Sequence, residues 1–512
     1  MTLYILLTIN TDPAKEYITM PKHPLLYGES LALLTDLYQL TMAYGYWQTD
    51  YAEKEAEFTL YFRHLPFKGG YAIAAGIAPA LEFIKSLQFT DSDIHYLASL
   101  TGQDNQPLFS VEFLDYLAVL QFDVDIDAVP EGSVIFAHEP LLRIRGRLLV
   151  CQLLETALLT IVNFQTLIAS KAARVCQAAQ GDSVLEFGLR RAQGIDGGIS
   201  ASRAAYIGGC AATSNVLAGK LHGIPVKGTH AHSWVMAFED ELTAFRRYAD
   251  SLPNNCTFLV DTYDTHTGTE NAITIAQELR EKGHQLQGVR LDSGDLNQLS
   301  QQTRQQLDEA GLADVPIIAS NDLDEYTISA LKAAGAKISV WGVGTKLITS
   351  YDQPALGGVY KLHALRDSAD TPWDYKIKIS ADATKTTLTG QLQIRRFYDP
   401  HTQYYIGDIL YDINHTPCLT AHTLAEGEAQ HFPETANYTD LLQAVMRDGD
   451  ILPDVLPKLA DIRDYAQQQQ QMLQPSLTTL ISTASYPVLL EAQCYHIRQQ
   501  LILQTRNVGN AL

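Results

Sequence analysis

The 512-residue sequence has six cysteines, few positive charges and no long apolar run. The cysteines are scattered and include no CxxC pair, which argues against a zinc site of the usual spacing and against a disulfide framework. A reducing, cytoplasmic setting is therefore expected. Because no run of about 18 apolar residues occurs, we also expect no membrane-spanning helix.

The chain also has fewer basic than acidic residues. The sequence holds 37 lysines and arginines against 58 acidic residues, which gives a formal net charge of −21. Nucleic acids and anionic membranes bind basic surfaces, so neither is expected as a partner. Small anionic substrates stay compatible with this balance, because a few local cations and backbone N–H groups hold them, often with a metal ion. A Walker-type GxxxxGK[ST] loop is also missing, which excludes that kind of nucleotide site.

The middle third of the chain alternates short apolar runs with helix-like segments, and most runs end in a polar or glycine-bearing cluster. This alternation predicts a parallel sheet. Because the polar clusters all follow strands, an α/β barrel is favoured over an open doubly wound sheet. The expected strands are 184–187, 224–226, 258–260, 288–291, 315–319 and 338–341, and the expected helices are 202–221, 269–282, 296–310 and 323–334.

We divide the chain into four segments. Residues 1–19 match nothing that follows, and Met20 is a candidate start of the protein. Residues 20–145 and 361–512 mix strand-like and helical stretches, and we expect them to form one mixed α/β domain. The second of these segments is predicted to be β-rich at first and mostly helical beyond residue 437. Residues 146–360 are predicted to form the barrel.

Two turns after predicted strands carry groups that suit anions. The GVGT stretch that ends in Gly344 and Thr345 is either a tight strand-to-helix turn or a cradle of free N–H groups for a phosphate. Arg190 and Arg191 follow another strand. An exposed arginine pair is usually just solvated, but at the rim of a barrel its forked donors suit phosphate or carboxylate.

The stretch from Arg290 to Asp295 combines one cation with two acids. Strand alternation puts Arg290 and Asp292 on the same side. One interpretation is a buried structural ion pair. The other is a site in which Arg290 holds an anion while Asp292 or Asp295 holds Mg²⁺ or ribose hydroxyls.

His230 and His232 stand two residues apart in a short loop, next to Thr229. Zinc binding is one interpretation, although no cysteine or acid is near in sequence to complete a ligand shell. A nucleophile or proton shuttle that works near neutral pH is the other, and spacing leaves both open. Tyr38, in the first amphipathic helix, is either a core aromatic or a ring that stacks on a planar ligand.

Taken in order, these stretches resemble the nicotinate phosphoribosyltransferase family, which has a type II phosphoribosyltransferase fold. The resemblance runs from about residue 31 to about residue 500, and so many ordered matches make chance negligible. The segments that carry it are TDLYQLTMAYGYW (35–47), AEFTLYFRHLPFKGGYAIAAGI (56–77), EFGLRRAQGIDGG (186–198), GTHAHSWVMAF (228–238), LVDTYDT (259–265), GVRLDSGDL (288–296), ASNDLDE (319–325) and GVGTKLITSYDQPALGGVYKL (342–362).

The resemblance implies an irregular TIM-like α/β barrel joined to a mixed α/β domain built from the N- and C-terminal segments. It implies that nicotinate and phosphoribosyl pyrophosphate give nicotinate mononucleotide and pyrophosphate in NAD salvage. Hydrolysis of ATP to ADP and phosphate is coupled to this reaction. Mg²⁺ is implied as a cofactor, ATP as a co-substrate, and a homodimer with shared active sites as the assembly.

By position, the resemblance gives each candidate residue a role. His232 is the histidine that ATP transiently phosphorylates, whereas His230 falls where the family varies. Tyr38 is the aromatic that stacks on the pyridine ring across a dimer interface. The remaining roles are nicotinate binding for Thr229 and Arg290, phosphoribosyl pyrophosphate binding for Gly344, Thr345 and Arg191, catalysis and Mg²⁺ binding for Asp292, and Mg²⁺ binding for Asp295.

Three other functions fit parts of the pattern. In the related enzyme that takes nicotinamide, an acid beside the ring would favour the amide, whereas Arg290 without an obvious opposing acid favours the carboxylate. Quinolinate phosphoribosyltransferase handles a dicarboxylate without ATP and has no need for His232. A non-catalytic nucleotide-binding barrel that regulates a partner would be expected to lack His232, Arg290 or Thr345, and all three are present.

Overall fold

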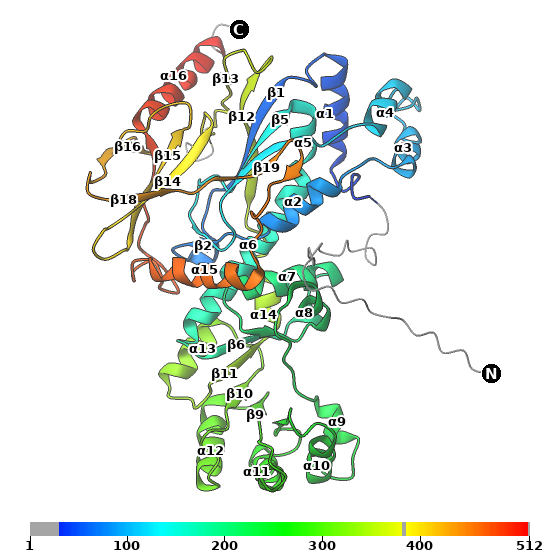
Figure 1. The fold of residues 1–512 in the computed structure, drawn as a ribbon, viewed down its shortest axis with the longest axis vertical. Helices are drawn as coiled ribbons and strands as arrows, with labels where there is room; N and C mark the ends of the chain where they lie inside the picture. Colours follow the sequence, from blue (N-terminus) through cyan, green and yellow to red (C-terminus); the bar gives the residue numbers. More distant parts are fainter. Residues whose placement is uncertain (1–29, 381–385, 510–512) are drawn as a thin grey trace, which may run out of the picture.

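The computed structural model describes residues 30–380 and 386–509. The expected extension 1–19 and the candidate start at Met20 lie outside the described residues. In Figure 1 a curled parallel sheet with its helices occupies the lower part of the molecule, and the two other large sheets occupy the upper part; β2 and β4 form a separate two-stranded sheet. In the described part of the chain, no helix is long and apolar enough to cross a membrane.

The parallel sheet has six strands in the order β7-β6-β11-β10-β9-β8. Strands β8 to β11 lie side by side in chain order, and β11 then pairs with β6, which returns the sheet towards its start. The curl is that of half a barrel, which confirms the irregular barrel expected from the sequence. The strands are β6 (Ser183–Glu186), β7 (Ala212–Thr213), β8 (Thr257–Leu259), β9 (Gly288–Leu291), β10 (Ile317–Ala319) and β11 (Val340–Val343).

Helices connect these strands, and aspartates begin four of them. Asp240, Asp264, Asp295 and Asp324 each accept a hydrogen bond from a backbone N–H in the first turn of the helix that follows. Such caps satisfy N–H groups that have no partner within the helix. The helices are η2 (Leu189–Arg191), α7 (Ile195–Ile207), α8 (Val216–His222), α9 (His232–Met236), α10 (Glu241–Ser251), α11 (Thr265–Glu281), α12 (Leu296–Glu309), α13 (Glu325–Ala333) and α14 (Thr345–Ile348).

Two expectations fail between β6 and β8. The helix expected over 202–221 is broken into α7 and α8, because the chain turns at Gly208 and at Gly209, whose φ is +116°. A Cβ at position 208 would lie 2.3 Å from the carbonyl oxygen of Ala169, so only glycine fits this close approach. The strand expected over 224–226 is reduced to one parallel bridge, Thr213 to Val226, because Pro225 has no N–H to donate.

The upper part contains an antiparallel sheet of seven strands in the order β13-β12-β1-β5-β3-β19-β20. Its strands come from both halves of the chain, as the expected mixed domain requires. The N-terminal elements are α1 (Leu37–Gln48), β1 (Glu55–Phe62), η1 (Pro66–Lys68), β2 (Ala72–Ile73), α2 (Ile77–Ser86), α3 (Asp91–Ala98), α4 (Val111–Ala118), β3 (Asp125–Ala128), β4 (Val134–Ile135), β5 (Leu142–Arg147), α5 (Leu148–Leu153) and α6 (Glu155–Ala178).

A third sheet, of the order β17-β16-β21-β15-β14-β18, lies beside α16. The expectation of a mostly helical chain beyond residue 437 is wrong in part, because β18 to β21 lie there alongside α15 and α16. The C-terminal elements are β12 (Gly358–Arg366), β13 (Asp374–Tyr375), β14 (Leu392–Tyr398), β15 (Tyr405–Asp412), β16 (Thr420–Thr423), β17 (Ala429–His431), β18 (Asn437–Asp440), β19 (Gln443–Arg447), β20 (Asp450–Ile451), α15 (Leu459–Gln471), β21 (Val488–Glu491) and α16 (Ala492–Gly509).

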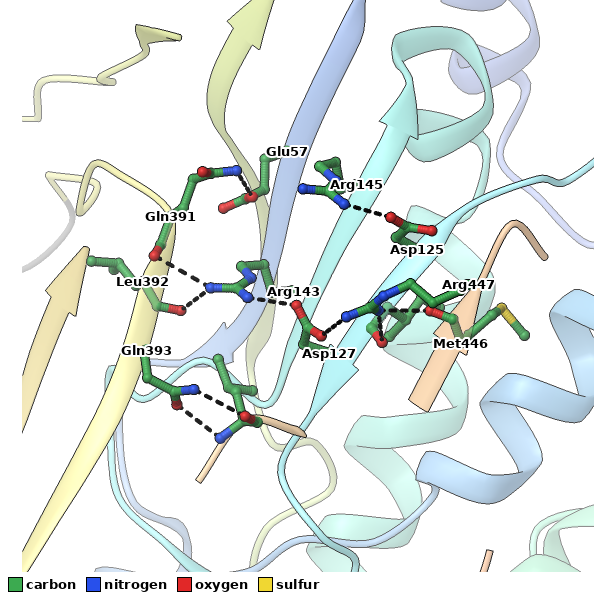
Figure 2. A network of polar contacts seen from close by, with 12 residues as sticks. Glu57, Asp125, Asp127, Arg143, Arg145, Gln391, Leu392, Gln393, Met446 and Arg447 are labelled. Atoms are coloured by element: carbon green, nitrogen blue, oxygen red, sulfur yellow. Dashed lines mark hydrogen bonds and ion pairs between the residues drawn. The ribbon is translucent and has the colours of Figure 1, made fainter. Parts of the chain in front are cut away.

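Polar bonds join chain segments that are far apart in sequence. Figure 2 shows Asp127 of β3 between Arg143 of β5 and Arg447 of β19, with ion-pair distances of 2.5 and 2.6 Å. Arg143 also donates to the carbonyl oxygens of Gln391 and Leu392. These bonds fix the C-terminal strands against the N-terminal ones, and so build the mixed domain from both ends of the chain.

Candidate active site

Most of the residues singled out in the sequence lie near the carboxyl ends of the parallel strands. Arg290 lies in β9 and Asp292 follows it, and His232, the first residue of α9, contacts Thr262 after the end of β8. Gly344 and Thr345 follow β11. Because all six strands are parallel, their carboxyl ends lie on one edge, which is where ligands bind in barrels and open α/β sheets.

The guanidinium of Arg290 is the centre of this cluster. Its Nε donates to Ser320 Oγ at 2.8 Å, and its two terminal nitrogens donate to Thr229 Oγ1 at 2.9 Å and to Asp292 Oδ1 at 3.0 Å. A guanidinium has one N–H on Nε and two on each terminal nitrogen. Each terminal nitrogen of Arg290 therefore keeps one N–H for a ligand.

Asp292 opposes Arg290 directly, so the expectation that Arg290 has no opposing acid is wrong. Oδ1 of Asp292 accepts from Arg290 and from the hydroxyl of Ser320. The backbone N–H of Asp292 donates to Asp261 Oδ2 at 2.8 Å, which ties the end of β9 to the end of β8. Oδ2 of Asp292 lies 3.8 Å from His232 Nε2. Asp292 Oδ2 therefore makes no hydrogen bond to the described residues and lies between Arg290 and His232.

One ring nitrogen of His232 contacts a neighbouring side chain, and the rest of the ring is accessible to solvent. Its Nδ1 lies 3.1 Å from the hydroxyl oxygen of Thr262, and Nε2 faces Asp292. Its side chain is 40% exposed. An anchored, accessible imidazole suits a nucleophile or a proton carrier.

His230 has a different environment, although it is only two residues away. Its ring packs between Phe245, Tyr248 and Phe258, with centroid distances of 5.8, 5.2 and 6.1 Å. Nε2 accepts the N–H of Leu259 at 3.3 Å, and Nδ1 lies 3.3 Å from the carbonyl oxygen of Ala231. Burial lowers the pKa of His230 to about 4. Both ring nitrogens are engaged, so the zinc interpretation of this histidine pair is wrong.

The turn at Gly344 and Thr345 packs tightly against the end of β6. The carbonyl oxygen of Gly344 accepts the N–H groups of Leu347 and Ile348 at 3.2 and 3.1 Å. A Cβ at position 344 would lie 3.2 Å from the carbonyl oxygen of Phe187, so glycine lets the two loops approach. Thr345 is the first residue of α14, and its hydroxyl makes no hydrogen bond to another described residue.

Three predicted site residues lie outside this cluster. Arg191 is exposed in η2, at the end of β6. Asp295 caps α12, where Oδ1 accepts the N–H groups of Asn297 and Gln298 at 3.0 and 3.1 Å. Tyr38 lies on α1 in the upper part of the molecule, well separated from α9 in Figure 1, and it is 48% exposed.

Sequence reasoning assigned no role to three residues that build the site. Asp261 holds the backbone of Asp292, Thr262 bonds His232, and Ser320 bridges Arg290 and Asp292. All three directly follow strands β8 or β10. Their position at a strand end was the available signal, but small polar residues are also common in ordinary loops.

Among the described residues, no group of three or more histidines, cysteines, aspartates or glutamates could hold a metal ion. Asp292 Oδ2 nevertheless makes no hydrogen bond to the described residues, and Asp295 Oδ2 is likewise uncommitted. Mg²⁺ is commonly held by one or two carboxylates together with substrate phosphates and water. The uncommitted oxygen of Asp292 fits that kind of site, and the described residues do not form an all-protein cage.

Comparison with known families covers most of the chain. The nicotinate phosphoribosyltransferase (NAPRTase) N-terminal domain matches residues 33–163, the NAPRTase family matches residues 183–404, and the NAPRTase C-terminal domain matches residues 391–498. Nicotinate phosphoribosyltransferase of Bacillus subtilis is 44% identical over 484 residues, which cover 94% of this chain and 96% of that protein.

The chain belongs to the nicotinate phosphoribosyltransferase family.

Further relatives and solved structures match most of the chain. Nicotinate phosphoribosyltransferase of Mus musculus is 36% identical, with 90% of this chain and 94% of that protein covered. The crystal structure of human nicotinic acid phosphoribosyltransferase aligns with a TM-score of 0.78 at 33% identity, over 91% of this chain and 99% of that one. A nicotinate-nucleotide pyrophosphorylase from Pyrococcus furiosus has a TM-score of 0.64 at 23% identity, which shows a shared fold.

The candidate residues lie inside the matched parts of the nicotinate phosphoribosyltransferase family. The central match, 183–404, contains His232, Arg290 and Thr345, and the N-terminal match, 33–163, contains Tyr38. The two matches therefore place Tyr38 and the residues of the half-barrel in different domains of the family. In Figure 1, α1, which carries Tyr38, is also well separated from α9, which begins at His232.

Proposed function

We propose that this protein joins nicotinate to phosphoribosyl pyrophosphate, giving nicotinate mononucleotide and pyrophosphate, with coupled hydrolysis of ATP to ADP and phosphate. The observation that carries the proposal is Arg290, which keeps one N–H on each terminal nitrogen at the ligand-binding edge of the half-barrel. Paired N–H groups of this kind match the two oxygens of a carboxylate. Membership of the family supplies the identity of that carboxylate as nicotinate.

In this proposal Arg290 and Thr229 bind nicotinate. Thr229 orients the guanidinium through its hydroxyl, and Ser320 fixes Nε from the other side. Asp292 lowers the net charge of the pocket, so nicotinate is recognised by directed N–H groups more than by excess positive charge. The same acid is the observation that favours the second candidate, a nicotinamide phosphoribosyltransferase, because a carboxylate can accept from an amide.

Gly344, Thr345 and Arg191 are proposed to bind the phosphoribosyl pyrophosphate. The free hydroxyl of Thr345 suits the 5-phosphate, and the exposed Arg191 suits the pyrophosphate. Breaking the bond between the anomeric carbon and pyrophosphate builds positive charge on the ribose, which the Asp292 carboxylate is placed to stabilise. Asp292, together with the capping residue Asp295, would hold Mg²⁺, which would neutralise charge on the leaving pyrophosphate.

His232 is proposed as the residue that ATP phosphorylates. A ring nitrogen forms a bond to the γ-phosphorus while the bond from that phosphorus to the bridging oxygen breaks, and ADP leaves. Water later cleaves the nitrogen–phosphorus bond and releases phosphate. The phosphohistidine adds negative charge beside Asp292 and Arg290, which shifts the hydrogen bonds of the pocket.

A homodimer is proposed to complete the site. The face of α1 that carries Tyr38 also exposes Leu37 and Met42 by 54 and 41%, and Leu34, just before the helix, is exposed by 51%. Exposed apolar stripes of this kind mark contact surfaces. A second copy that covered this face would bring its own Tyr38 to a pocket that this chain lines only in part. The six free thiols support our further proposal of a reducing, cytoplasmic setting.

The deciding experiment is a turnover assay with Mg²⁺ and phosphoribosyl pyrophosphate, which offers nicotinate or nicotinamide, each with and without ATP. Mononucleotide from nicotinate, accelerated by ATP and accompanied by ADP, is the expected result. Product from nicotinamide alone would assign the second candidate and give Asp292 the specificity role. Binding of substrates without any product would instead indicate a regulatory barrel.

A further inference from the structure

The N-terminus of α13 holds the α14 turn from both sides. At the start of α14, Lys346 donates from Nζ to Asp324 Oδ2 at 2.7 Å. Beyond its end, Asp352 contacts Lys171 Nζ at 2.5 Å, and the same Nζ lies 2.7 Å from Glu325. Asp324 and Glu325 are neighbours in sequence, so one helix end anchors both flanks of the turn that contains Thr345.

Lys346 follows Thr345 directly, and its charge suggests a phosphate ligand at first sight. Its partner argues otherwise. The Asp324 side chain is only 9% exposed, and its Oδ1 already accepts the N–H of Thr327 at 2.7 Å as the cap of α13. If Lys346 moved to a phosphate, Asp324 would remain as an unpaired, poorly hydrated anion next to that phosphate. Such a rearrangement is unfavourable both through desolvation and through repulsion.

The electrostatics of the pair point the same way. The hydrogen bond to Asp324 raises the pKa of Lys346. The pKa of Asp324 is lowered, because the bonds from Lys346 and from Thr327 outweigh the opposing effect of burial. Both groups therefore stay charged and paired at neutral pH. The pair is also a tie between the end of β10, which carries Ser320, and the turn after β11.

We infer that Lys346 is a positioning residue, which fixes the Gly344–Thr345 turn through Asp324 and does not bind the phosphate itself. The inference rests on the proposed binding of the 5-phosphate by this turn. It assigns to Asp324 a second duty besides capping α13. If this is so, removing the negative charge of Asp324 should weaken the binding of phosphoribosyl pyrophosphate. Simple charge repulsion predicts the opposite, because it would make the binding of an anion stronger.

Asp324→Asn is the decisive variant, because asparagine still caps α13 but no longer forms the ion pair. We expect the KM for phosphoribosyl pyrophosphate to rise about tenfold in Asp324→Asn and in Lys346→Met, with the KM for nicotinate unchanged within about twofold. The double variant should be no worse than either single one, because both remove the same tie. Lys346→Arg, which keeps a donor for Asp324, should restore binding.

Electrostatics alone, or a role of Lys346 as phosphate ligand, predicts a different outcome. Asp324→Asn would then free the lysine or remove a repulsive charge, and it would lower the KM for phosphoribosyl pyrophosphate. A lowered or unchanged KM in Asp324→Asn overturns the inference. A double variant in which the effects of the two single substitutions on this KM add also overturns the inference.

The matched control is Lys332→Met, which breaks another partly buried ion pair at the other end of α13. Lys332 contacts Asp182 at 2.6 Å, with side-chain exposures of 20 and 22%. Its loss should lower thermal stability to a similar degree without changing the KM for phosphoribosyl pyrophosphate. Calorimetric titration with phosphoribosyl pyrophosphate gives a readout independent of turnover. Failure of the proposed function would appear in the wild-type protein, whereas failure of this inference would appear only in the variants.

Discussion

Arg290 illustrates how a single side chain acquires a chemical role from its neighbours. Ser320, Thr229 and Asp292 each take one N–H, and their positions fix the plane of the guanidinium. A lysine would offer three donors on one nitrogen and could not reproduce this arrangement. The role of Arg290 therefore depends on its geometry as well as on its charge.

Replacement of Arg290 by lysine tests that geometry. We expect kcat/KM for nicotinate to fall about a hundredfold, or about 2.7 kcal/mol, because the paired N–H groups are lost while the charge remains. Steady-state kinetics at saturating phosphoribosyl pyrophosphate measure the change. Arg280→Lys on α11 is the control, since Arg280 donates to the carbonyl oxygen of Gly311 away from the site. Equal losses in both variants would show that the effect is not specific to Arg290.

The two histidines of the 228–238 segment should respond differently to substitution. Incubation with γ-labelled ATP should label the wild-type protein and His230→Gln, but not His232→Asn. His230 is buried with both nitrogens engaged, so His230→Gln should instead lower the free energy of unfolding by about 1–3 kcal/mol. Acid-labile label retained in His232→Asn would move the phosphorylated residue elsewhere.

At the scale of elements, β1 carries a buried acid inside the seven-stranded sheet. Glu57 of β1 accepts from the side chain of Gln391, as Figure 2 shows, and is 1% exposed. Burial raises the pKa of Glu57 from 4.5 to about 8, against the opposing effect of Arg143. The folded protein thus retains a proton that the unfolded chain releases above pH 4.5.

This sign determines a pH dependence. The stability that depends on the proton of Glu57 is fully present below pH 4.5 and is lost as the pH rises towards 8. At pH 7 the free energy of unfolding is lower by about 3 kcal/mol than it is below pH 4.5. Glu57→Gln keeps a neutral side chain of the same shape, so it should stabilise the protein at pH 7 and flatten the dependence between pH 5 and 8. Urea unfolding at several pH values measures this, and an unchanged slope would contradict it.

At the scale of the whole molecule, buried charges connect the half-barrel to the rest of the chain. Lys171 of α6 is fully buried and pairs with Glu325 of α13, and Arg174 of the same helix donates to Glu325 at 2.9 Å. Removal of one partner from such a group leaves an uncompensated buried charge. The position of α6 against the half-barrel is therefore strongly specified.

A mixed-dimer experiment tests the proposed shared site. Tyr38→Ala and His232→Asn homodimers should both have low activity, because each lacks one component of every site. After random mixing, half the dimers are hybrids with one intact site, so about a quarter of the wild-type activity should return. Activity that stays at the level of the parents would place Tyr38 outside the site. Sedimentation equilibrium on the same samples checks that dimers form.

Local sequence signals predicted the helices and strands where the physical cause is local. The helix expected over 323–334 agrees with α13, because the cap at Asp324 and the positive φ of Gly335 depend on adjacent residues. The break after Ile207 was missed, although Gly209 has a positive φ; the close approach of Gly208 to the carbonyl oxygen of Ala169 depends on another helix and is not visible in the local sequence. The strands of the 437–451 region were missed for a similar reason, since β19 is stabilised by pairing with the distant β3.

The sequence by itself determined the parallel sheet and the strand ends at which Arg290, Asp292, Gly344 and Thr345 lie, because strand alternation and strand ends are local properties. Tertiary structure alone decided that His230 is buried and His232 accessible. It also decided that Asp292 opposes Arg290 and that Lys346 pairs with Asp324. Those outcomes depend on contacts between loops that follow different strands. Contacts of that kind leave no periodic trace in the chain, because each depends on where the strands place the loops in space.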